Sequence, residues 1–223
     1  MYGSAFRKIA MVTMLALAMV PAAHATVLAP GGSATPPQDF ATGFIGATVA
    51  DTGLEPIVGT GGVYTANLRS IVIVDNTTGF LDFLYQVLKT GGQDAISQIT
   101  VANFQTPFTT DVGVCTACAN LLAGVTGFSA STEDERSIGT GDVVRWNYGT
   151  GAISGNGMAS NILVIKTNAS RFAPGDINTI DGGVTSSTAF QPTTVPEPGT
   201  LGLVLSGLFA VGFVARRGRV VQK

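Results

Sequence analysis

Cys115 and Cys118 are the pair whose spacing most directly suggests chemistry in this chain of 223 residues. Two thiolates cannot complete the four-coordinate site of a structural zinc ion unless two carboxylates join them. A redox-active Cys-x-x-Cys pair needs the strand and helix N-terminus of a βαβ unit, and that pattern is missing around these cysteines. The spacing therefore predicts a local disulfide, which is usual in an oxidising compartment, with redox activity and metal binding as the lesser alternatives.

The single histidine, His24, restricts the catalytic chemistry further. It lies in an N-terminal segment that we expect to be removed, so the mature chain would contain no imidazole. Ser-His-Asp and Cys-His arrangements and histidine metal ligands are then excluded. We expect no enzymatic activity, no cofactor and no metal site.

Residues 51–53, Asp-Thr-Gly, match the loop triplet of aspartic proteases. That chemistry needs two carboxylates that share a proton, and the chain has no second triplet, so only a homodimer would supply the pair. Asp, Thr and Gly are also common turn residues, and a turn is the prediction.

Two further acidic stretches could bind or catalyse through carboxylates. From Asp176 to Asp181 the oxygen side chains are spaced roughly as in a calcium loop, but the third comes one residue late and no bidentate Glu follows. A hairpin or an Asx turn is the prediction, with calcium left open. Residues 133–135, Glu-Asp-Glu, predict a solvated loop, and no acid pair suited to glycoside hydrolysis can be identified.

Aromatic side chains offer one more candidate site, a platform on which sugar rings could stack. Trp146 and Tyr148 alternate with polar residues and share their face with Val144. This period of two is typical of a strand with one buried face. We therefore expect both rings in the core, because an exposed sugar platform would not share its face with a valine.

The elements that must position these residues are strands. Residues 63–74 and 80–89 are rich in β-branched and aromatic residues and flank turn-forming residues at 75–79, which predicts a hairpin. Residues 96–104 and 161–167 predict further strands, and a short helix is plausible at 119–124. The sequence thus predicts an all-β fold, an antiparallel β-sandwich of seven to ten strands with immunoglobulin-like or jelly-roll-like topology.

Composition divides the chain into a folded middle and two apolar ends. We expect a flexible leader over 26–39, the sandwich over 40–184 and a Ser/Thr/Pro-rich spacer over 185–195. Residues 26–195 carry 13 acidic and 6 basic side chains, a net charge of −7. Nucleic acids require clustered cations, so a nucleic-acid partner is not expected.

Residues 1–25 have the three parts of a secretory signal peptide. A basic start is followed by twelve apolar-region residues, 9–20, and by a small-x-small cleavage site at Ala23 and Ala25. Twelve residues span only about 18 Å as a helix, too short for a bilayer core of about 30 Å. We expect cleavage after Ala25 and export through the inner membrane.

The other end of the chain has the pattern of a membrane anchor. Residues 199–215 are apolar or small and long enough for a transmembrane helix in a slightly thinned bilayer. The basic tail, 216–223, contains Arg216, Arg217 and Arg219, which by the positive-inside rule places the C-terminus in the cytoplasm and the preceding domain outside.

Val195, Pro196, Glu197 and Pro198, the apolar stretch and the arginine-rich end together resemble a PEP-CTERM sorting signal over residues 196–223. The resemblance implies a Gram-negative producer of extracellular polysaccharide, transient anchoring in the inner membrane, and cleavage near Pro196–Pro198 by an exosortase-type membrane protease. The partners it implies are that protease, the membrane before processing and extracellular polysaccharide.

These observations give the functional expectation. The chain is expected to be an exported structural or adhesive protein of the cell surface or extracellular matrix, linked to biofilm formation. A carbohydrate-binding module and a glycan hydrolase that acts through carboxylates are the competing predictions.

Overall fold

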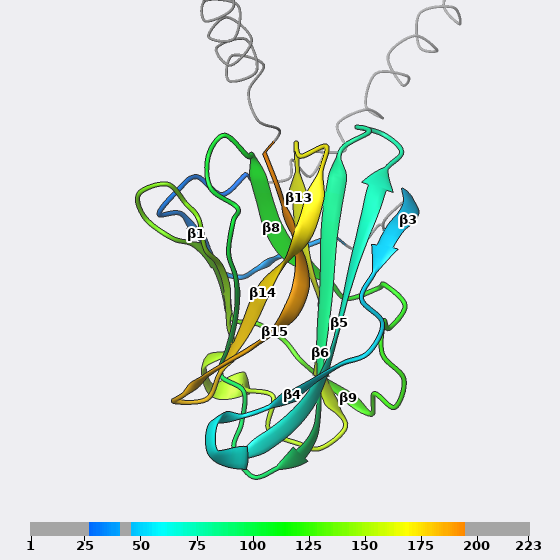
Figure 1. The fold of residues 1–223 in the computed structure, drawn as a ribbon. Coiled ribbons are helices and arrows are strands. Elements are labelled where there is room, and N and C mark those ends of the chain that lie inside the picture. The colour runs from blue at the N-terminus through cyan, green and yellow to red at the C-terminus, as the bar shows by residue number, and fades with distance from the viewer. Residues whose placement is uncertain (1–26, 41–45, 195–223) are drawn as a thin grey trace, which may run out of the picture.

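The computed structural model describes residues 27–40 and 46–194, which form an all-β fold (Figure 1). Six strands make one sheet, in the order β1-β10-β11-β7-β14-β15, and nine make the other, in the order β2-β8-β13-β6-β12-β9 with β5 beside β6 and with β3 and β4 beside β5. In chain order the strands are β1 Ser33–Ala34, β2 Gln38–Asp39, β3 Gly46–Asp51, β4 Glu55–Val58, β5 Tyr64–Asp75, β6 Leu81–Gly92, β7 Gln98–Val101, β8 Thr110–Cys115, β9 Gly127–Ser129, β10 Glu133–Arg136, β11 Val144–Asn147, β12 Met158–Ser160, β13 Ile162–Thr167, β14 Phe172–Ile180 and β15 Val184–Pro192.

The predicted hairpin is confirmed as β5 and β6, which pair along nearly their whole lengths. Its turn depends on Asp75, whose Oδ1 accepts hydrogen bonds from the backbone amides of Thr77 and Thr78 at 2.6 and 3.2 Å. Gly79 then takes a φ of +73°, a left-handed conformation that glycine adopts without strain. The turn chemistry read from residues 75–79 therefore sets the register of the longest strand pair.

The core lies between the two sheets, because the side chains of each strand alternate between an inner and an outer face. Trp146 of β11 contacts Tyr85 of β6 across the interface, with ring centroids 6.2 Å apart. Trp146 and Tyr148 are both fully buried, so the prediction that they belong to the core is confirmed. An open aromatic face for sugar stacking on these two rings is accordingly ruled out.

The sequence-based prediction was wrong in three details of the fold. Residues 27–40 and 46–194 contain fifteen strands instead of seven to ten, because several are only two to four residues long and leave no periodic signal. Two strand pairs, β2 with β8 and β9 with β12, are parallel, so the sheets are mixed. Residues 119–124 form an irregular segment with bends and one turn instead of a helix.

The expected flexible leader over 26–39 belongs to the folded body from residue 27 onward. β1 pairs with β10 of one sheet, β2 pairs with β8 of the other, and Leu28 is buried in the core. The prolines and glycines limit each paired segment to two residues. Such short segments cannot show the alternation of apolar and polar residues that predicts a strand.

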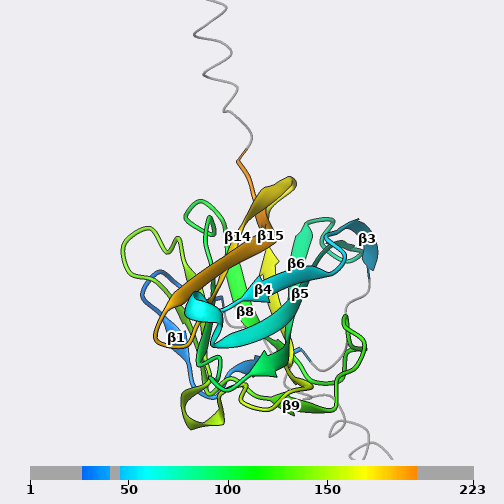
Figure 2. The same cartoon turned by 60° about the horizontal axis from the view of Figure 1, so that its bottom comes forward.

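The prediction of a spacer over 185–195 was also wrong for most of that range, because β15 runs to Pro192 and pairs with β14 along its whole length. Its hydroxyl residues alternate between more and less exposed positions, the pattern of an edge strand. Figure 2 shows the β14–β15 hairpin beside β4 and β5. Phe190 of β15 is held across the sheets, because its amide donates to Ser70 Oγ at 3.1 Å and its carbonyl accepts from Tyr85 Oη at 2.7 Å.

Both ends of the described chain lie at one end of the sandwich, which we name the terminal end (Figure 1). Val27 forms a bridge with Asp111 near the start of β8. The amide of Thr193 donates to the carbonyl of Arg171, just before β14, at 3.1 Å. The starts of β6, β8 and β14 and the ends of β5, β13 and β15 meet there.

Several predictions concern residues outside the described ranges: the signal peptide, the motif at 195–198, the helix at 199–215 and the basic tail. Within residues 27–40 and 46–194, no helix has the length and apolar character needed to cross a bilayer.

Candidate functional site

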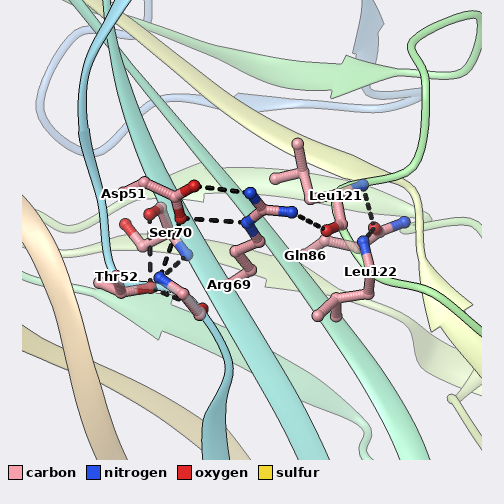
Figure 3. A network of polar contacts seen from close by, with 8 residues as sticks. Asp51, Thr52, Arg69, Ser70, Gln86, Leu121 and Leu122 are labelled. Carbon is pink, nitrogen blue, oxygen red and sulfur yellow. Dashed lines mark hydrogen bonds and ion pairs between the residues drawn. The ribbon is translucent and has the colours of Figure 1, made fainter.

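The Asp-Thr-Gly triplet lies at the end of β3, where its carboxylate is committed to an ion pair (Figure 3). Arg69 donates from Nε and Nη2 to Oδ1 and Oδ2 of Asp51 at 3.0 and 2.6 Å. The hydrogen bonds from Arg69 hold the pKa of Asp51 below its usual value. The Asp51 Oδ1 also accepts from the Gly53 amide at 2.9 Å, so the predicted turn is confirmed. An ionised, paired carboxylate cannot share a proton as in a protease dyad.

The same network holds the loop after the cysteines against the outer face of the larger sheet (Figure 3). Arg69 Nη1 donates to the carbonyl of Leu121 at 2.6 Å. Gln86, fully buried on β6, accepts from the amides of Leu121 and Leu122 at 2.8 and 3.0 Å. This arrangement is structural, since its donors and acceptors satisfy one another.

The predicted disulfide between Cys115 and Cys118 is confirmed, with Cα atoms 5.5 Å apart. Cys115 ends β8 and packs into a small apolar cluster on the outer face of the larger sheet. The bond closes the first turn of the loop that Arg69 and Gln86 hold further along. No cysteine in the described part of the chain is free for redox or metal chemistry.

Replacing both cysteines by serine is expected to lower the free energy of unfolding by only about 2 kcal/mol, because the closed loop is very short. The loop keeps its bonds to Arg69 and Gln86, so the fold should survive. Urea unfolding followed by circular dichroism measures the change. Loss of the cooperative transition would show instead that the disulfide is required for folding.

The two other acidic stretches have structural positions. Asp176 lies in β14, and Asp181 accepts from the Gly183 amide at 3.0 Å in the β14–β15 turn, so the hairpin and Asx turn are confirmed. Among the described residues, no group of acidic, cysteine or histidine side chains has a metal-binding arrangement. Residues 133–135 were wrongly predicted as a solvated loop: they form β10, and Asp134 is fully buried.

Asp134 faces the core beside Trp146, its cross-strand neighbour on β11. Its Oδ1 accepts from Ser131 Oγ at 3.0 Å, and its Oδ2 has no hydrogen-bond partner. Burial raises the pKa of Asp134 to about 7. The group is enclosed by the sandwich and is out of reach of a substrate.

Arg136, two residues further along β10, is 2% exposed and binds only backbone carbonyls. Its guanidinium donates to the carbonyls of Leu28, Phe104, Phe108 and Gly141 at 2.6 to 3.2 Å. These carbonyls come from the N-terminal segment, the β7–β8 loop and the β10–β11 loop. One buried cation therefore holds three loops in place.

A second group of buried charges lies on the outer face of the larger sheet at the terminal end. Lys166 of β13 stands between Asp82 of β6 and Asp111 of β8, directly opposite each in register. The aspartates are 2% and 6% exposed, and each has one carboxyl oxygen without a hydrogen-bond partner. Burial raises the pKa of Asp82 to about 7 and of Asp111 to about 6, against the opposing effect of Lys166. The Lys166 ammonium lies 3.9 Å from Asp75 Oδ2.

Two hollows open at the terminal end. A mainly apolar groove of about 430 Å³ is lined by Val49, Val74, Leu81 and Phe172, together with Arg171.

The other hollow is a polar cleft of about 250 Å³, which we name the Asn103–Gln191 cleft. It lies between the β7–β8 loop and the paired ends of β14 and β15. No charged residue of the ranges 27–40 and 46–194 lines it. Neither Asp82 nor Asp111 lines either hollow.

No protein-family model, curated protein or solved structure matches the chain. The terminal end contains most of the features that could serve a function, namely the two hollows and the buried charges around Lys166.

Sequence reasoning missed the residues of the cleft and the buried charges. Asp82 and Lys166 did carry a signal, since each is a single charge within a strongly apolar strand. A charge in such a run is buried or partly buried and therefore needs an explanation. Asn103 and Gln191 gave no such signal in the sequence, because amide side chains are ordinary in loops and on strand edges. The two residues contact each other only through strand pairing between distant parts of the chain.

Proposed function

We propose that the chain is an exported structural or adhesive protein of the cell surface or extracellular matrix. The signal peptide, residues 1–25, delivers it, the segment 199–215 with its basic end anchors it, and an exosortase-type protease cleaves near Pro196–Pro198. The finer topology, immunoglobulin-like or jelly-roll-like, stays a prediction.

The position of the terminal end is the observation that supports this proposal. The last strand ends at Pro192, and the amide of Thr193 donates a hydrogen bond to the carbonyl of Arg171. Only four residues, 195–198, separate Thr194 from Gly199, where the proposed anchor begins, so these two residues lie at most about 18 Å apart. An anchor beginning there holds the domain close to the bilayer with the rest of the sandwich directed outward. The disulfide suits the oxidising side of the membrane.

Intact-mass spectrometry of protein from cells and from the culture matrix tests the proposal. We expect a species that runs from Thr26 to the neighbourhood of Pro196, outside the inner membrane. Persistence of Arg216–Lys223 in all of the protein, with retention in the inner membrane, would contradict processing and leave an ordinary single-span protein.

The competing hydrolase function finds little support in the geometry. A glycosidase needs two carboxyl groups about 5 to 10 Å apart at a site open to substrate. Asp82 and Asp111 are buried and flank Lys166, and they line neither hollow of the terminal end. We therefore propose a non-enzymatic role.

A further inference from the structure

The Asn103–Gln191 cleft combines uncharged polar groups with apolar patches. Asn103, Gln105 and Gln191 supply amides, while Phe108 and two prolines, Pro174 and Pro192, supply apolar surface. Among the described residues no charged side chain lines the cleft, so none of them offers a counter-charge to an anionic or a cationic ligand. Such a surface suits a neutral molecule that has both hydroxyl groups and C–H faces.

A chain of hydrogen bonds fixes the orientation of the amides. Gln191 Nε2 donates to the backbone carbonyl of Asp176 at 2.5 Å, and Asn103 Nδ2 donates to Gln191 Oε1. A carbonyl can only accept, so both amide groups are oriented unambiguously. Asn103 Oδ1 is left as an acceptor with no partner among the described residues. The side chain of Gln105 is exposed and makes no hydrogen bond within the described part of the chain, while its backbone carbonyl accepts from the Phe108 amide at 3.0 Å.

The backbone around the cleft is built to hold this arrangement. Gln191 is 2% exposed, and it can pack there only because residue 175 is glycine, since a Cβ at Gly175 would lie 1.8 Å from Gln191 Oε1. Asn103 has a φ of +65° and is the one non-glycine residue of the described ranges with a positive φ. The backbone amide of Asn103 donates a hydrogen bond to Asp142 Oδ1 at 2.8 Å. Strained residues of this kind concentrate at binding sites.

We propose that the Asn103–Gln191 cleft binds a single neutral pyranose unit of a polysaccharide. The cleft of about 250 Å³ is smaller than the roughly 300–1,000 Å³ of sites for drug-sized ligands, which fits one ring. Amide groups bind neighbouring hydroxyls, and the apolar face of a sugar ring packs on Phe108 and the prolines. The inference deepens the proposed adhesive role and rests on it for the source of the sugar, the extracellular polysaccharide.

Nuclear magnetic resonance of the ¹⁵N-labelled full chain tests this inference, in a detergent without a sugar headgroup. The probes are the methyl glycosides of glucose, galactose and mannose and free N-acetylglucosamine, each up to roughly 50 mM, where millimolar affinities saturate. We expect at least one to shift the side-chain amide signals of Asn103, Gln105 and Gln191 in a saturable way.

Two variants and a matched control make the test specific. Asn103→Gly keeps the left-handed backbone without strain but removes the amide, so the protein should fold and the saturable shifts should disappear. Gln105→Ala should weaken binding about tenfold through the loss of one or two hydrogen bonds. Gln93→Ala, an exposed glutamine beside the end of β6, should bind as the original chain does.

Two results would overturn the inference: no saturable shift with any of the four sugars, or shifts that persist in Asn103→Gly. Either result leaves the processing test by intact mass untouched. Conversely, sugar binding by a chain that is never processed would reject the sorting proposal and keep the binding site.

Discussion

Arg136→Met is expected to lower the free energy of unfolding by at least about 3 kcal/mol, because several buried carbonyls lose their donor and each such loss costs about 1–3 kcal/mol. Methionine retains most of the apolar volume, so the loss reports on the hydrogen bonds. The carbonyls of Leu28, Phe104, Phe108 and Gly141 would be left without this partner. Lysine has too compact a donor group to reach all of them, so Arg136→Lys should be destabilising too.

The matched control is Arg145→Met, one strand away in β11. Arg145 pairs with Glu135 at 3.0 Å, with both side chains more than a third exposed. A surface pair of this kind contributes about 0–1 kcal/mol. Urea unfolding curves measure both variants. Equal losses in the two variants would mean that the buried guanidinium has no special structural role.

The stability of the protein is expected to fall as the pH rises from about 4 to about 8. Burial raises the pKa of Asp134 to about 7. It also raises the pKa of Asp82 to about 7 and that of Asp111 to about 6. Between these values and the ordinary pKa near 4, the unfolded chain releases protons that the folded chain keeps. Their stabilisation is therefore complete below pH 4 and is lost as the pH passes through the folded-state values.

Asp134→Asn isolates one of the two larger contributions, since the pKa of Asp82 is raised to about 7 as well. A pKa of about 7 in place of 3.8 corresponds to roughly 4 kcal/mol. The variant should therefore be more stable than the original chain at pH 8, about equal to it at pH 4, and less dependent on pH between them. Glu133→Gln, whose side chain is half-buried on the outer face of the same strand, is the control. An unchanged pH profile in Asp134→Asn would mean that this carboxyl ionises without cost.

Some elements could be predicted from the sequence because their signals are local. The β5–β6 hairpin combines alternating residues with a strong turn at 75–79, and β11 alternates clearly around Trp146. The disulfide followed from the spacing of the cysteines, from the absence of a βαβ pattern around them and from the lack of histidine ligands for a metal. The hairpin and the strand were each predicted from one continuous stretch of the chain, residues 63–89 and 144–148.

The errors arose where long-range pairing decides the structure. β1 and β2 have two residues each, and only their partners β10 and β8 make them strands. The serines and threonines of β15 resemble those of a linker until β14 lies beside them. Lys89 and Arg136 are almost fully buried because loop carbonyls far away in the chain converge on them, which no local pattern records.

The pairing of β15 has a mechanical consequence for a protein held by its C-terminal end. A pull on Thr194 away from the terminal end runs along the axis of β15, so the nine residue pairs with β14 are loaded in shear and must yield together. The bonds of Phe190 to Ser70 and Tyr85 add resistance from the other sheet. A pull on Val27 would instead load its single bridge to Asp111 first and then β1 and β2, whose two-residue pairings can open one at a time. The chain therefore tolerates tension best at the end where we propose the anchor.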